Sequence, residues 1–371
     1  MSVSRQLNWV NIGWLFLSPV TAAIVVPLFL FHAGFTWSGL AWFVAACFLS
    51  SFGITAGYHR LFAHRSYVAS PLLKAFYLLA GAGNFQGSAL QWAADHRRHH
   101  RYVDSDNDPY SISKGFWYAH IGWLFHEDVV GKQNYPADLL NDKMIVLQDR
   151  YYVWFAIGTG FLVPWGIGYL VGSPMGGLII GGLARIVFCQ HCTFMINSLS
   201  HYMGRQTYTL KNSARDNLLM AFLAYGEGWH SFHHRFQSDY RNGFRWYHWD
   251  PTKWLIASMS WLGQASRLKT VPDSLILQAR MQTEEARLLS TGVVPEARLT
   301  ALKHRFEAAQ VSVRALYEEY KVAKRERVEL ARVKLAQLRA ELKVAKLERK
   351  MAFQQWCAYV RTMRRAVPAY R

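Results

Sequence analysis

Residues 8–33, NWVNIGWLFLSPVTAAIVVPLFLFHA, contain no Lys, Arg, Asp or Glu, in a chain of 371 residues. Further uncharged runs cover residues 37–57, 152–184 and 186–202. An α-helix of about 20 apolar residues, rising about 1.5 Å per residue, crosses the roughly 30 Å hydrocarbon core of a bilayer. The runs therefore predict an all-α integral membrane protein rather than a soluble protein with buried helices. The expected transmembrane helices cover residues 11–33, 37–57, 151–171 and 176–199.

The charge between these runs is distributed asymmetrically. The turns near residues 33–37 and 172–175 are short and uncharged, so we expect the four helices to form two hairpins. Apart from Arg185, the basic residues lie at Arg5, in residues 58–150 and after residue 203, and the chain has a net charge of +18. Because basic loops stay on the cytoplasmic side, we expect both termini and the middle segment in the cytoplasm. The few residues before the first helix favour a bacterial inner membrane.

Nine of the 15 histidines form clusters beside the predicted helices. In an α-helix, positions i, i+3 and i+4 share one face, so each H-x-x-H-H motif directs three imidazoles to one side. The i and i+4 rings can bind one metal ion while the i+3 ring reaches a second. The clustered segments are HRLFAH (59–64), HRRHH (96–100), NSLSH (197–201) and HSFHH (230–234).

The chemistry of imidazole indicates which metals these clusters can bind, and the number of imidazoles indicates how many ions. Neutral imidazole suits Fe, Zn, Cu or Ni, whereas Mg and Ca prefer oxygen ligands. Nine ligands are too many for one ion, so the sequence predicts two metal ions. His59 and His64 are five residues apart, and we therefore expect the helix to end or bend between them.

The segments that surround these histidines resemble a known family. They are similar to the three histidine boxes of the membrane fatty acid desaturases, in the acyl-CoA delta-9 (stearoyl-CoA type) branch, and the resemblance runs from about residue 10 to residue 265. It implies a four-span helical bundle with a cytoplasmic cap that carries a di-iron centre. The resembling segments are GITAGYHRLFAHRSY (53–67), WAADHRRHHRYVDSDNDPY (92–110), GFWYAHIGWL (115–124), NSLSHYMGRQTY (197–208) and GEGWHSFHHRF (226–236).

The resemblance also implies how the ligands divide between two irons. One iron would be bound by His59, His64, His96, His100 and His233. The other would be bound by His99, His201, His230 and His234, with Asn197 holding it through a water. Nearby carboxylates are expected either to orient the imidazoles or to cap helices and turns; they are Asp95, Asp104, Asp106, Asp108 and Glu227.

The implied reaction is the introduction of a cis double bond, at the delta-9 position, into a saturated fatty acyl chain with dioxygen as co-substrate. In the family, residues that match Gln86, Trp92 and Thr193 line the bend of the substrate tunnel. Cys47, Ser51, Thr55 and His59 recur every four residues, so they form one stripe that we expect to border the acyl chain. Family members often carry a bulky aromatic where Cys47 stands, which leaves the preferred chain length open.

The substrate and the electron source remain open at this point. The residues do not separate acyl-CoA, which the resemblance favours, from an acyl-lipid. The chain carries no dinucleotide-binding glycine motif, haem domain or iron–sulfur cysteine cluster, so we expect an external ferredoxin or b-type cytochrome with its reductase. A related di-iron hydroxylase and, more distantly, a histidine-rich metal transporter or sensor are the alternatives.

Two domains are expected, residues 1–270 and residues 271–371. The second is a helical extension with 21 Lys and Arg against 11 Asp and Glu, and the family resemblance does not cover it. Its apolar spacing allows a coiled coil, a helical hairpin on the cap, or a basic surface for anionic lipid headgroups. No motif supports nucleic-acid binding.

Overall fold

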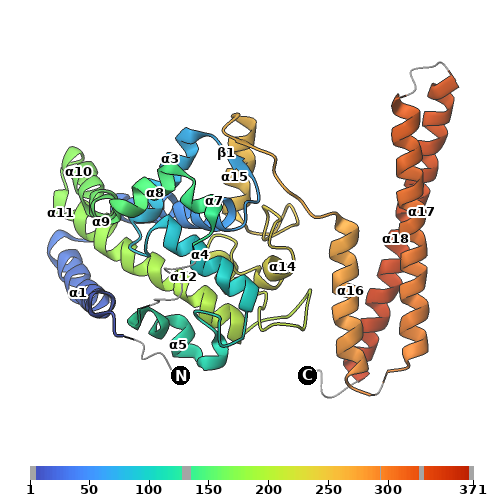
Figure 1. The fold of residues 1–371 in the computed structure, drawn as a ribbon, viewed down its shortest axis with the longest axis horizontal. Coiled ribbons are helices and arrows are strands. Elements are labelled where there is room, and N and C mark those ends of the chain that lie inside the picture. Colours follow the sequence, from blue (N-terminus) through green and yellow to red (C-terminus); the bar gives the residue numbers. More distant parts are fainter. Residues whose placement is uncertain (1–5, 128–134, 293, 326–329, 367–371) are drawn as a thin grey trace. The chain divides into compact units, whose positions relative to one another are not determined.

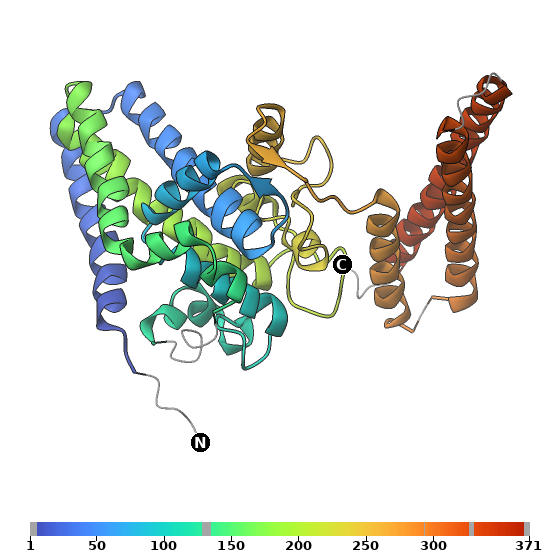
Figure 2. The same cartoon turned by 45° about the horizontal axis from the view of Figure 1, so that its top comes forward.

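The protein is described here by a computed structural model that covers residues 6–127, 135–292, 294–325 and 330–366. The chain is mainly helical and divides into two compact units, Met1–Val271 and Pro272–Arg371 (Figures 1 and 2). The first unit contains the apolar helices and every clustered histidine.

Four helical segments in the first unit are long and apolar enough to cross a membrane: Trp9–Ala33, Trp37–Ala63, Tyr152–Leu170 and Pro174–Tyr202. The four predicted spans and the all-α membrane fold are therefore confirmed. Local sequence explains where the first two begin. The side chains of Asn8 and Thr36 accept hydrogen bonds from the backbone N–H groups of Asn11 and Gly39.

The second span changes its winding before it reaches the first histidine motif. α2 (Trp37–Phe52) continues as the π-helix η1 (Gly53–Ala63), which ends at Ala63, between His59 and His64 as expected. A π-helix bonds residue i to residue i+5. The backbone N–H of His64 donates to the carbonyl of His59 at 3.0 Å, so two residues five apart lie on one face. The wider helix therefore brings both imidazoles to the same side.

The π-helix packs closely on α3 (Pro71–Ala82), and two glycines make this contact possible. A Cβ atom on Gly53 would lie 2.2 Å from the backbone nitrogen of Gly81, and one on Gly57 would lie 2.5 Å from Cβ of Tyr77. Larger residues at positions 53 and 57 would therefore push α3 away. The helix α4 (Ala89–Tyr102), which carries HRRHH, packs on the same π-helix.

The remaining elements of the first unit complete the bundle and its cap. A short antiparallel sheet pairs β1 (Val68–Ala69) with β2 (Ala265–Ser266) in the register Val68↔Ser266. The other helical elements are α1 (Trp9–Ala33), η2 (Ile112–Lys114), α5 (Phe116–His120), η3 (Gly122–Phe125), α7 (Ala137–Leu140), α8 (Lys143–Arg150), α9 (Tyr152–Ile157), η4 (Gly158–Leu162), α10 (Val163–Leu170), α11 (Pro174–Gly176), η5 (Gly177–Ala184), α12 (Arg185–Tyr202), α13 (Leu218–Leu223), α14 (His230–Arg235) and α15 (Pro251–Trp261).

The second unit consists of α16 (Asp273–Leu289), α17 (Glu296–Arg325) and α18 (Leu330–Ala366). The long helices α17 and α18 are antiparallel, because Phe306 contacts Phe353 while Tyr320 contacts Arg339. Their base has a hydrophobic core of its own, which is centred on Met281, Leu288, Leu299, Phe306, Trp356 and Val360.

Candidate metal centre

The π-helix, α4 and α14 bring five imidazoles together in what we name the first histidine group. Its donor nitrogens all lie within 4.8 Å of one another. Nε2 of His59 is 3.0 Å from Nε2 of His233, which in turn is 2.9 Å from Nε2 of His100. Nε2 of His64 is 2.9 Å from Nε2 of His96. The members of this group are His59, His64, His96, His100 and His233.

Four further imidazoles form a second histidine group, again with donor nitrogens within 4.8 Å of one another. It combines His99 of α4 and His201 near the end of α12 with His230 and His234 of α14. Nε2 of His230 lies 2.9 Å from that of His201 and 3.1 Å from that of His234. In each H-x-x-H-H motif, the i and i+4 histidines thus belong to one group and the i+3 histidine belongs to the other.

The spacing within both groups fits metal ions. Two imidazole nitrogens that bind one ion at about 2.1 Å and at a right angle lie about 3.0 Å apart. The Nε2–Nε2 distances of 2.9, 3.0 and 3.1 Å agree with that value. Within the part of the chain that the structure describes, each group consists of histidines alone. Nitrogen-only sites of this kind suit transition metals rather than Mg or Ca.

Polar partners on the outer side of several rings fix the ring orientation. Nδ1 of His59 lies 2.9 Å from a carboxylate oxygen of Glu227, and Nδ1 of His99 lies 2.9 Å from one of Asp108. His201 is linked to Asp104 through the hydroxyl of Ser213, which is 2.7 Å from Nδ1 of His201. A carboxylate that holds the proton on Nδ1 leaves Nε2 free to bind a metal.

The other two carboxylates named from the sequence lie elsewhere. Asp95 lies 3.7 Å from the guanidinium of Arg98, one turn along α4. Asp106 is exposed, and its backbone carbonyl accepts a hydrogen bond from Lys114. In their place the structure adds Tyr110, whose hydroxyl lies 3.1 Å from Nδ1 of His96.

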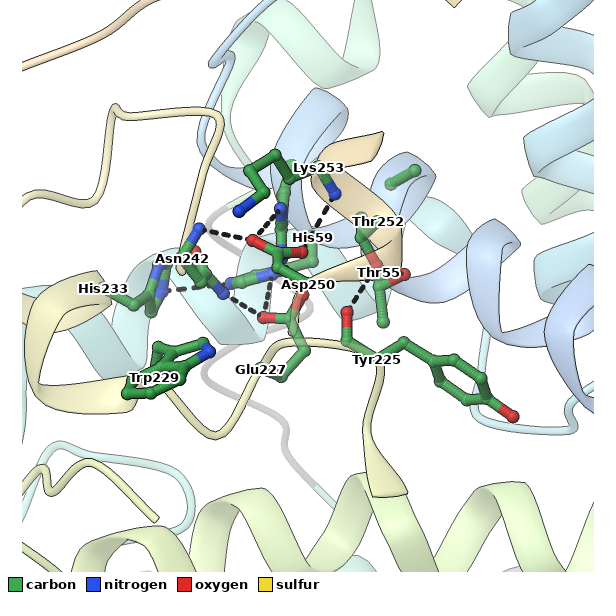
Figure 3. A network of polar contacts seen from close by, with 12 residues as sticks. Thr55, His59, Tyr225, Glu227, Trp229, His233, Asn242, Asp250, Thr252 and Lys253 are labelled. Atoms are coloured by element: carbon green, nitrogen blue, oxygen red, sulfur yellow. Dashed lines mark hydrogen bonds and ion pairs between the residues drawn. The ribbon is translucent and has the colours of Figure 1, made fainter. Parts of the chain in front are cut away.

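A buried charged network supports Glu227 (Figure 3). The guanidinium of Arg60, which is 1% exposed, donates to Glu227 at 2.9 Å and to Asp250 at 3.0 Å. Asn242 donates to the other oxygen of Glu227 at 2.6 Å. Asp250 also accepts the backbone N–H groups of Asn242 and Lys253. The network therefore fixes the carboxylate that contacts His59.

Burial and charge set the protonation of these groups. Burial, followed by the neighbouring imidazoles, lowers the pKa of seven histidines well below the ordinary value of 6.5: His64, His96, His99, His100, His230, His233 and His234. A neutral imidazole ring keeps the nitrogen lone pair that a metal ion requires. Burial alone would raise the pKa of Glu227, but His59 and Arg60 lower it to about 2. Burial raises the pKa of Asp108 to about 7, against the opposing backbone N–H groups of Asp104 and Tyr110.

A cavity adjoins both histidine groups. His59 and His96 of the first group and His230 of the second form part of its wall, together with Asn197. Trp92 stacks on His96 with ring centroids 5.0 Å apart. The predicted substrate residues Ser51, Thr55, Gln86, Trp92 and Thr193 all line this cavity, where Gln86 donates to Thr193 at 3.1 Å.

Cys47 differs from the other members of its stripe. It is not among the residues that line the cavity and is only 2% exposed. It packs with Cys189 and Tyr225, behind the wall that Ser51 and Cys189 form. The structure therefore places Cys47 one layer outside the cavity, and a direct contact with the substrate stays a prediction.

Fold and site together define a helical membrane protein with a paired histidine site for two metal ions beside a small-molecule cavity. Comparison with known proteins identifies the family. The sequence profile described as fatty acid desaturase matches residues 35–260. The chain belongs to the fatty acid desaturase family, as the histidine boxes predicted, and is an integral membrane protein, as the uncharged runs predicted.

Individual relatives come from several kingdoms. "Probable acyl-CoA desaturase" of Schizosaccharomyces pombe is 40% identical over 285 residues, which cover 76% of this chain and 58% of that protein. "Stearoyl-CoA desaturase 5" of Homo sapiens is 34% identical, over 71% of this chain and 84% of that protein. "sn-1 stearoyl-lipid 9-desaturase" of Anabaena variabilis is 34% identical, over 72% and 96%. The chain thus spans little more than half the length of the fission-yeast relative.

Proposed function

We propose that the protein is an oxygen-dependent fatty acyl desaturase that introduces a cis double bond into a saturated chain. The observation that carries this proposal is the position of the two histidine groups at the wall of one cavity. A metal transporter would require ionisable ligands along the spans. Here the metal-binding side chains gather at one end of the helices, where a bound molecule can reach them.

Iron is the metal that we propose for both groups. The first histidine group would hold one iron; the second would hold the other, with Asn197 contributing through a water. Bound iron supplies the dioxygen activation that an unreactive methylene C–H bond requires. The side chains of the protein orient the imidazoles: Glu227 does so at Nδ1 of His59, and Asp108 at Nδ1 of His99.

The overall reaction balances with two added electrons. Two adjacent methylene carbons each lose one hydrogen, and a C=C bond forms between them. Dioxygen takes up these two hydrogens with two electrons and two protons, and leaves as two waters. The cavity would position the chain for reaction: Trp92 and His96 line it at the first histidine group, and Ser51 and Cys189 belong to the same wall.

Acyl-CoA is the substrate that we favour, with the double bond at the delta-9 position. The names of the fission-yeast and human relatives support acyl-CoA, whereas that of the Anabaena relative supports an acyl-lipid, which remains the second candidate. An external ferredoxin or b-type cytochrome with its reductase would deliver the electrons. We place both termini and the histidine groups on the cytoplasmic side, because they lie in or beside the basic segments, and basic segments next to membrane spans stay in the cytoplasm. The assignment to a bacterial inner membrane stays a prediction.

Expression in a host that lacks its own unsaturated fatty acids tests the proposal. Gas chromatography should detect monounsaturated chains with the wild-type protein and none with His230→Ala. His248→Ala is the matched control, because His248 stacks on Trp229 outside both groups. Hydroxylated rather than unsaturated chains would favour the hydroxylase. Purified protein assayed with acyl-CoA and with phospholipid separates the two substrates.

A further inference from the structure

The second unit carries a groove that the desaturase family does not explain. Beyond residue 271 no part of the family profile applies, since the match ends at residue 260. The groove lies between α17 and α18 and is open to its surroundings. Its lining is rich in cations and tyrosines: Tyr317, Tyr320, Arg339, Leu342, Lys343, Lys346, Leu347 and Lys350.

Four cations form one stripe along α18. Arg339, Lys343, Lys346 and Lys350 follow a spacing of four, three and four residues, which places them on a single helix face. All four are exposed. Among the described residues of this unit, the ion pairs instead join Arg287, Lys303, Lys321 and Arg364 to glutamates. The stripe therefore presents its positive charge to the outside, where it attracts an anionic partner.

Apolar side chains accompany the cations on the neighbouring strip of the same helix. Val344, Leu347 and Met351 are 56%, 50% and 56% exposed. Their spacing of three and four residues makes a second, adjacent row. Tyr317, 45% exposed, adds an aromatic ring from α17. A helix surface that combines a row of lysines with a row of exposed apolar residues is typical of segments that lie in a membrane interface.

We infer that this face of α18 binds the anionic phospholipid headgroups of a bilayer. The cations contact the headgroup phosphates, and the apolar row enters the boundary with the acyl chains. A soluble polyanion such as RNA would use the cations but leave the apolar row in water, so the lipid surface fits both rows. The unit is joined covalently to membrane-spanning helices, which keeps its effective concentration near lipid high.

A fluorescent label on the apolar row tests the inference in the full chain. The polarity-sensitive dye NBD is attached to Val344→Cys in a Cys357→Ser background, because the other three cysteines are buried. The protein is reconstituted in nanodiscs of phosphatidylcholine, with or without phosphatidylglycerol. We expect a blue-shifted emission only with phosphatidylglycerol, with quenching by spin-labelled lipid and reversal by salt.

Two triple variants with the same change in net charge separate the groove from overall charge. The triple variant Lys343→Gln/Lys346→Gln/Lys350→Gln should lower the ratio of membrane-bound to free α18, which the label reports, on the order of 100-fold. This is the factor expected for the loss of three lysines at an anionic surface. Arg298→Gln/Arg305→Gln/Arg365→Gln alters three exposed arginines outside the groove and should keep the signal. Circular dichroism checks that both variants stay helical.

Three outcomes would overturn the inference. One is an emission that is the same with and without phosphatidylglycerol. Another is an equal loss of signal in both triple variants, which would assign the effect to net charge alone. The third is a shift produced by added RNA or an acidic protein in phosphatidylcholine nanodiscs while phosphatidylglycerol has no effect, which would assign the groove to a soluble partner.

Discussion

Glu227→Gln should weaken the binding of metal at the first histidine group while leaving the fold intact. The two oxygens of Glu227 accept hydrogen bonds from Arg60 and Asn242, and one of them lies 2.9 Å from Nδ1 of His59. The amide of Gln cannot satisfy all of these donors. If its NH2 group faces His59, it donates to Nδ1, and the ring proton moves to Nε2, the nitrogen that faces the metal. Loss of such a partner typically lowers metal affinity or activity by about 10- to 100-fold.

The assay is a chelator titration of the purified protein, with bound iron and desaturase activity measured in parallel. Asp239→Asn provides the matched control, because Asp239 is a buried carboxylate paired with Arg241 at 2.8 Å and belongs to neither histidine group. It should lower thermal stability without changing iron affinity. Equal iron affinity in wild type and a folded Glu227→Gln would refute the positioning role, as would an equal loss in Asp239→Asn.

Three further predictions follow from the site and the two units. The metal-free protein should lose stability as pH falls below about 6.5 and show little change in stability above that pH. The reason is that folding lowers the pKa of the buried histidines, so below pH 6.5 the unfolded chain binds more protons than the folded chain. A thermal midpoint that is the same at neutral and mildly acidic pH would contradict this prediction. Ser51→Phe should reduce turnover of long acyl chains more than of short ones, and Cys47→Phe should do so more weakly, since Ser51 lines the cavity and Cys47 lies behind it; a uniform loss across chain lengths would place the end of the acyl chain elsewhere. Deleting residues 272–371 should leave iron content and chemistry unchanged, because every clustered histidine lies in the first unit; loss of iron from a folded truncated protein would contradict the boundary.

Much of the site follows from short-range patterns in the sequence. The H-x-x-H-H spacing at residues 96–100 and 230–234 holds in any α-helix, so the shared face of those imidazoles is predictable. The transmembrane helices were also predictable from the uncharged runs, since length and apolarity alone decide whether a helix can cross a bilayer. Glu227 and Asp108 could be predicted as partners of the histidines because each lies within ten residues of a histidine motif in the sequence.

The parts that sequence reasoning missed depend on winding and on distant partners. An α-helix places His59 and His64 on different faces, and only the π-helical bonding from Gly53 to Ala63 aligns them. Arg60 stands beside His59 in the chain, but its partners Glu227 and Asp250 are 167 and 190 residues away. Ser213, which links His201 to Asp104, lies in a loop without a motif. Such pairings are set by the packed structure rather than by local spacing.

The iron content of the purified protein tests most directly the claim that the two histidine groups form a di-iron site. Elemental analysis by mass spectrometry should find two irons per chain in the wild type. It should find close to one in a folded variant that loses a ligand of a single group, such as His64→Ala or His201→Ala. One iron or fewer in the wild type, or two irons retained in both variants, would contradict the account.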